Sequence, residues 1–117
     1  MAFFCLKMTS LKQEALIEEL AQRSKDYTVD GFFEILGTYN NWRDQQSPQT
    51  FVSYLKKYSD DTYGPLAGTV FEEMGLRSGN ALIDVLLRLR CKDLIDGQGL
   101  ARITQEDQEI LDSHEPL

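Results

Sequence analysis

The feature that most constrains the fold is a stretch between residues 79 and 90 whose apolar side chains surround almost the whole of a helix. Aliphatic residues recur there at helical spacing and leave only a narrow polar face: Leu82, Ile83, Val85, Leu86, Leu87 and Leu89. A helix that is apolar nearly all round is normally central and buried. Ser78 has the position of its N-cap. The sequence therefore predicts a helical protein built around this segment.

Further helices are predicted by apolar stripes that begin at capping residues and end at asparagine, aspartate or glycine. Their expected spans are 10–24, 28–41, 47–58 and 65–74, with Gly75 as a left-handed stop. A last, acidic helix is expected to begin at a Thr104 cap and to reach about Asp112. We therefore expect a mostly α fold, a compact bundle of about five to six helices.

The chain of 117 residues has the usual length of one domain, and its hydrophobic share of 42% predicts a packed core. We expect a single domain over residues 1–117. Residues 1–8 are apolar and predict either an edge strand or a packed arm. Residues 113–117 contain little to bury and predict a disordered tail.

The second half of the chain shows an ordered series of elements. From residue 65 to 111 it predicts a helix, a glycine-centred turn at 74–78, the apolar helix 79–90, a short extended run at 100–103 and a closing helix. This order resembles a winged helix-turn-helix. The resemblance implies that the apolar helix is the one that enters DNA, and that residues 93–104 lead through a short β-hairpin.

The same resemblance implies a nucleic-acid-binding face. Arg77, Asn80 and Arg88 would meet base edges or phosphates. A solvated helix face is the alternative interpretation, because Asp84 lies in the middle of this surface, where it would repel phosphates and can instead pair with Arg88 at i to i+4.

Charge and targeting signals limit the partners. The formal net charge of −7 opposes approach to nucleic acid and to anionic lipid, so both are disfavoured partners. No apolar run reaches membrane-spanning length, and no secretory signal is recognisable. Cys5 and Cys91 have no metal-like spacing and are expected to be reduced, packed thiols. We therefore expect a cytoplasmic protein without membrane contact.

Residues that could carry catalysis are scarce. The single histidine, His114, lies in the expected tail, which excludes the common histidine-based triads. Two distant cysteines do not complete a zinc site. The turn at 96–99 lacks the lysine and the serine or threonine of a phosphate loop. We expect no catalytic residue, no metal and no cofactor.

Aromatic residues are concentrated between residues 27 and 63. Four of them fall on inward stripes and are expected in the core: Phe32, Tyr39, Phe51 and Tyr58. Phe33, Trp42 and Tyr54 fall off those stripes and are expected to be exposed. Trp42 beside Arg43 has the residue types of interface hot spots, although Trp42 could instead hold the following loop onto the core.

These observations favour a non-enzymatic protein-binding module that uses Phe33, Trp42, Arg43 and Tyr54. An inhibitor, an immunity factor, an adaptor or an assembly factor would fit. The expected partner is another protein, for which a basic face suits the acidic surface, or a second copy in a homodimer. The alternative function, which follows from the resemblance, is a winged-helix DNA-binding transcriptional regulator.

Overall fold

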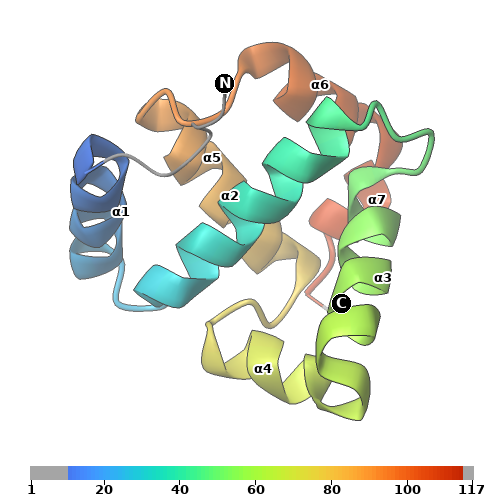
Figure 1. Cartoon of the computed structure of the whole chain (residues 1–117), viewed down its shortest axis with the longest axis horizontal. Helices are drawn as coiled ribbons and strands as arrows, with labels where there is room; N and C mark the ends of the chain where they lie inside the picture. The colour runs from blue at the N-terminus through green and yellow to red at the C-terminus, as the bar shows by residue number, and fades with distance from the viewer. Residues whose placement is uncertain (1–10, 115–117) are drawn as a thin grey trace.

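A computed structural model describes residues 11–114, and every regular element within them is a helix (Figure 1). The expected mostly α fold is confirmed. The arm or strand expected at residues 1–8 lies outside the described residues, as does most of the expected tail. In chain order the elements are α1 (Leu11–Arg23), α2 (Val29–Asp44), α3 (Phe51–Tyr63), the 3-10 turn η2 (Gly64–Leu66), α4 (Ala67–Glu73), α5 (Gly79–Cys91), α6 (Gly97–Glu106) and α7 (Gln108–Leu111).

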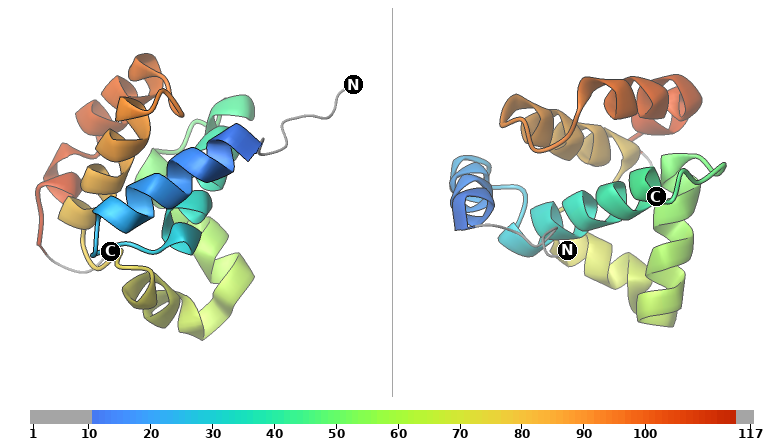
Figure 2. Two further views of the ribbon diagram at one scale, coloured as in Figure 1. Left: turned by 90° about the vertical axis from the view of Figure 1, so that its left-hand side faces the viewer. Right: turned by 45° about the horizontal axis from the view of Figure 1, so that its top comes forward.

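Helices α2 and α5 form the centre of the molecule and cross each other. Figures 1 and 2 show α1 and α3 on opposite sides of α2. Helix α5 also contacts α6 and α7, while α4 contacts α3. Each helix therefore buries one apolar face against this central pair or against a direct neighbour of it.

The apolar helix α5 is buried on one side only. Leu82, Val85, Leu86 and Leu89 lie in the core, as their spacing predicts. The predicted central position holds, but the buried face is narrower than the apolar one, because Leu87 is 48% exposed. Among residues 11–114, Leu87 therefore lies on a side of α5 that faces away from the core. Cys91 at the end of α5 is also exposed, so the expectation of a packed thiol is wrong.

The core joins α2 to α3 through three aromatic rings. Tyr39, Trp42 and Phe51 are all buried, with ring centroids 5.5 to 6.2 Å apart. Trp42 Nε1 donates a hydrogen bond to the carbonyl oxygen of Gln49 at 2.9 Å. The guanidinium of Arg102 covers the Trp42 ring, 4.4 Å from its centroid. These contacts hold the loop between α2 and α3 against α6.

The winged-helix resemblance is wrong, because no strand forms among residues 11–114. The segment expected as a hairpin is helix α6. Asp96 caps this helix, and its carboxylate accepts a hydrogen bond from the backbone N–H of Gly99 at 3.1 Å. Thr104, the expected cap of the last helix, lies inside α6. The expected turn at 96–99 is therefore the cap and first turn of helix α6.

Candidate functional site

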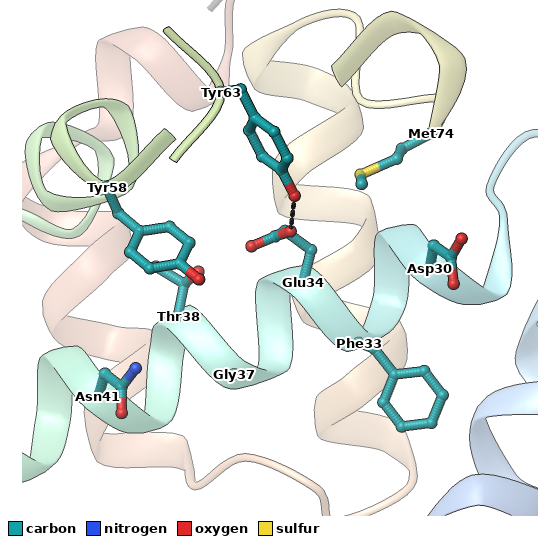
Figure 3. Close-up of a pocket in the computed structure, with 9 residues that line it drawn as sticks. All are labelled: Asp30, Phe33, Glu34, Gly37, Thr38, Asn41, Tyr58, Tyr63 and Met74. Carbon is teal, nitrogen blue, oxygen red and sulfur yellow. Dashed lines mark hydrogen bonds between the residues drawn. The ribbon is translucent and has the colours of Figure 1, made fainter. Parts of the chain in front are cut away.

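A groove of about 410 Å³ opens between α2, the end of α3 and the end of α4 (Figure 3). Its volume is within the range of small-ligand sites, roughly 300–1,000 Å³. Among the described residues, two carboxylates and no basic side chain line it, so we call it the acidic groove. Its lining residues are Asp30, Phe33, Glu34, Gly37, Thr38, Asn41, Tyr58, Tyr63 and Met74.

Helical periodicity places the polar floor of the acidic groove on one face of α2. Asp30, Glu34, Thr38 and Asn41 follow one another at intervals of four, four and three residues. Gly37 lies on the same face, and a Cβ atom at its position would meet no other atom within 4 Å. The lack of a side chain at Gly37 therefore leaves this part of the floor open.

A tyrosine and a carboxylate face each other inside the acidic groove. Tyr63 Oη donates a hydrogen bond to Glu34 Oε1 at 2.5 Å. This bond, together with partial burial and the charge of Glu34, raises the pKa of Tyr63 to about 12. The phenol is therefore a neutral donor near pH 7. Figure 3 shows the second carboxylate oxygen of Glu34 pointing away from Tyr63.

Thr38 brings a buried hydroxyl to the acidic groove. The residue is only 2% exposed, and its Oγ1 atom has no hydrogen-bond partner among the described residues. A buried polar atom without a partner costs about 1–3 kcal/mol. Ser24 and Ser59 also carry such hydroxyls, but neither lines the acidic groove. Thr38 therefore supplies an unused hydrogen-bonding group at this site.

Close backbone packing holds Met74 at one end of the acidic groove. The backbone N–H of Thr28, before α2, donates to the carbonyl oxygen of Met74 at 3.3 Å. Gly31 permits this approach, because a Cβ atom there would lie 3.0 Å from the same oxygen. Gly75 follows with φ +89°, which confirms the predicted left-handed stop. The start of α2 and the end of α4 are thus fixed to each other.

A second groove of about 310 Å³ lies along the other side of Tyr58. We call it the Tyr54 groove, and its lining residues are Gln45, Ser47, Gln49, Tyr54, Lys57, Tyr58 and Asp61. Tyr54 Oη donates to Gln45 Oε1 at 3.3 Å across this groove. Because Tyr58 also lines the acidic groove, its side chain is the wall that the two grooves share.

Tyr58 was expected in the core, and that prediction is wrong, since the residue is 37% exposed. The buried stripe of α3 runs through Phe51, Val52, Leu55 and Ser59. Ser59 therefore takes the inward position of this turn, and Tyr58 lies at the edge of the stripe, between the grooves.

The four predicted protein-binding residues have different surroundings. Phe33 and Tyr54 are half-buried, and each lines one of the two grooves. The expected exposure of Trp42 is wrong, because the ring is 1% exposed. It follows Tyr39 by three residues and so shares its inward side, where Arg102 covers it. Arg43 is exposed and pairs with Asp96 at 3.0 Å.

Two of the three residues of the alternative nucleic-acid-binding face contact the protein itself. Asn80 Nδ2 donates to the carbonyl oxygen of Leu111 at 2.9 Å. Arg88 pairs with Asp84 at 3.3 Å, which confirms the pair expected from their spacing. Tyr27 Oη also donates to Asp84, at 2.8 Å. Arg77 is exposed.

Of the nine residues that line the acidic groove, the sequence predicted only Phe33 as a contact residue and missed the other eight. One signal for them was present in α2. A glycine inside a helical pattern costs about 1 kcal/mol relative to alanine, and Gly37 is such a residue. Tyr63 and Met74 come from other helices, and only the fold brings them to α2.

The described chain shows neither a metal-binding cluster nor a membrane-spanning helix. Residues 11–114 contain no group of three or more histidine, cysteine, aspartate or glutamate residues that could hold a metal ion. None of the helices in that range combines the length and apolar character needed to cross a membrane. Comparisons with protein-family models, with curated proteins and with solved structures find no match.

Proposed function

We propose that this chain is a non-enzymatic protein-binding module that holds a segment of another protein across the face formed by α2 and α3. The observation that carries the proposal is the pair of grooves on either side of Tyr58. Phe33 and Tyr54, which the sequence predicts as contact residues, line one groove each. A segment that crosses Tyr58 contacts both.

The residue types of this face suit protein recognition. Aromatic residues are enriched at protein interfaces, and tyrosine combines a large apolar surface with a polar end. Tyr54, Tyr58 and Tyr63 offer this combination. Trp42 supports the face from beneath through its packing on Phe51, the first residue of α3, and makes no direct contact with the partner in this proposal.

Charge favours a basic partner. In the part of the chain that the structure describes, the acidic groove is lined by two carboxylates and no basic residue, whereas the Tyr54 groove is lined by one lysine and one aspartate, Lys57 and Asp61. The whole chain carries a formal charge of −7. Complementary charge speeds encounter and selects partners. Inhibitors, adaptors, immunity factors and assembly factors all act through such a binding face.

Peptide display tests the proposal. Random peptides are selected on the immobilised full chain, and the affinity of enriched peptides is measured by fluorescence anisotropy. We expect Tyr58→Ala to weaken binding by at least about tenfold, because loss of a central aromatic residue from an interface has an effect of this size. Far-UV circular dichroism checks that the variant is folded.

Two glycines provide a matched pair of variants. A Cβ atom at Gly37 or at Gly68 would meet no other atom within 4 Å, and both residues lie in helices. Gly37→Leu fills the acidic groove, whereas Gly68→Leu changes a residue that lines neither groove. We expect only Gly37→Leu to weaken peptide binding. The proposal fails if no peptide is enriched, or if enriched peptides bind the Tyr58 and Gly37 variants as tightly as the wild type.

A further inference from the structure

We infer that the acidic groove receives the ammonium group of a lysine side chain from the bound segment. The inference rests on the proposed function and names the chemistry that one of its two grooves recognises. It is carried by three features of the groove: unbalanced negative charge, an unpartnered buried hydroxyl, and a carboxylate with one oxygen already engaged.

The groove carries negative charge that a bound cation would balance. Asp30 and Glu34 are one helical turn apart on α2 and both line the groove. Within residues 11–114 no lysine or arginine lines it, and neither carboxylate has an ion pair there. A bound cation would balance charges that the fold itself leaves unbalanced.

The hydroxyl of Thr38 can accept a hydrogen bond from a ligand as well as donate one. It is buried, lines the groove and lacks a partner, so a donor that reaches it would satisfy a group the fold leaves unpaired. Glu34 lies one turn earlier on the same face of α2. Both residues line the groove floor, and we expect a single donor group to face them together.

The hydrogen bond that Glu34 already accepts favours an ammonium over a guanidinium as its ligand. A guanidinium binds a carboxylate best through two parallel hydrogen bonds, one to each oxygen. One oxygen of Glu34 already accepts the hydrogen bond from Tyr63. An ammonium is a compact charge with three donors that point in different directions, which suits separate single acceptors.

The rest of the groove suits the four-carbon stem of lysine. The open space above Gly37 admits a chain beside the floor of α2. Tyr58 and Met74 lie on either side of the Glu34–Tyr63 pair in Figure 3 and offer apolar surface. Long basic side chains commonly bury their stems along such surface while the charge reaches polar groups.

A titration with small probes tests the inference without any selected peptide. The amide spectrum of the isotope-labelled full chain is recorded by NMR as Nα-acetyl-lysine methylamide is added. We expect saturable shifts at the amides of Glu34, Gly37, Thr38 and Tyr63. The Nε-acetylated probe, which lacks the charge, should cause none of them, and the matching arginine probe should bind more weakly. No saturable shift at these amides, or tighter binding of the arginine probe, overturns the inference.

Two hydroxyl variants separate binding from folding. Thr38→Val keeps the shape of the side chain and removes only the unpartnered hydroxyl, so stability should not fall. It should nevertheless weaken binding of the lysine probe about threefold, and Glu34→Gln should weaken it about tenfold. Ser59→Ala removes a similar buried hydroxyl outside the groove and should leave probe binding unchanged. Equal binding by wild type and Thr38→Val contradicts the role of that hydroxyl.

The inference and the proposed function fail in different ways. Peptides that depend on Tyr58 but contain no required lysine would leave the protein-binding function intact and overturn lysine recognition. If lysine is required, replacing it by norleucine in a selected peptide should reduce affinity about tenfold. If no peptide depends on Tyr58 while the lysine probe still binds the groove, the groove recognises an amine and the protein-binding proposal is the part that fails.

Discussion

Helix α2 carries two tyrosine–carboxylate pairs in opposite surroundings. On its inner side Tyr39 donates a hydrogen bond to Asp96, and burial followed by this bond raises the pKa of Tyr39 to about 12. On its outer side Glu34 accepts a hydrogen bond from Tyr63, which lines the acidic groove. The inner tyrosine is fully buried, whereas the outer one is half-buried.

The difference lies in what surrounds each carboxylate. Asp96 accepts hydrogen bonds from Tyr39, from Arg43 and from the backbone of Gly99, and so joins α2 to α6. Glu34 accepts only the bond from Tyr63 among the described residues, and it faces open volume next to an unpartnered threonine. The same donor and acceptor chemistry thus stabilises the fold on one side of α2 and leaves binding capacity on the other.

The largest expected effect on stability comes from a comparison of two ring deletions, one on the inner and one on the outer side of α2. Trp42→Ala should lower the free energy of unfolding by about 3–5 kcal/mol, because it empties a buried site in the core. Tyr58→Ala should lower it by about 1 kcal/mol or less, because the ring is partly exposed. Urea unfolding followed by circular dichroism at 222 nm measures both, since Trp42 is the only tryptophan and fluorescence would be lost with it.

Comparable losses for these two variants would contradict the distinction between a structural inner face and a binding outer face. Tyr58 would then be part of the core despite its exposure. If the distinction holds, Tyr58→Ala weakens peptide binding while it changes stability little. A further variant, Trp42→Phe, would show whether the ring of Trp42 or its N–H bond to Gln49 contributes more to stability.

An intermediate effect is expected from the carboxylates. Asp96→Ala should cost about 1–2 kcal/mol, because it removes the N-cap of α6 and the acceptor for Tyr39. Glu34→Ala should change stability by no more than about 0.5 kcal/mol. Thermal and urea unfolding at pH 7 measure the two differences. A larger cost at Glu34 would assign it to the fold instead of the groove.

The contribution of Asp96 also depends on pH. The hydrogen bond from Tyr39 holds the pKa of Asp96 below its ordinary value, with further help from the Gly99 N–H and Arg43. A lowered folded-state pKa gives stability that is fully present above the unfolded pKa of about 3.9 and is lost as the pH falls through the folded value. The stability difference between wild type and Asp96→Ala should therefore be constant from pH 7 to about pH 5 and shrink below about pH 4.

How much the sequence predicts depends on whether the deciding contact is local. The Ser78 cap, the inward face of α5 and the Gly75 stop depend on neighbours within one helix or turn, and they were predicted. Helix α6 was missed because two glycines weaken its first turn, and a hydrogen bond from distant Tyr39 helps to fix its cap.

The difference between local and distant contacts also explains which residues of the candidate site were predicted. Phe33 was predicted as a contact residue from its position off the apolar stripe of α2, and it lines the acidic groove. The sequence left two positions open for Trp42, and the structure has it holding the following loop onto the core, where its cover, Arg102, comes from a helix far along the chain. The facing position of Tyr63 and Glu34 depends on the packing of α3 on α2, which periodicity alone does not specify.

The smallest expected effect is a gain in stability. Gly37→Ala should raise the free energy of unfolding by about 0.5–1 kcal/mol, because alanine favours a helix interior and the new methyl group meets no neighbour. Gly31→Ala, in the same helix, should instead lower it by roughly 1 kcal/mol, because its Cβ atom would lie 3.0 Å from the carbonyl oxygen of Met74. Urea midpoints of the two variants give the comparison. A gain at Gly37 would mean that the position is as open in solution as in the structure, whereas a loss would mean that the groove closes on this position in solution.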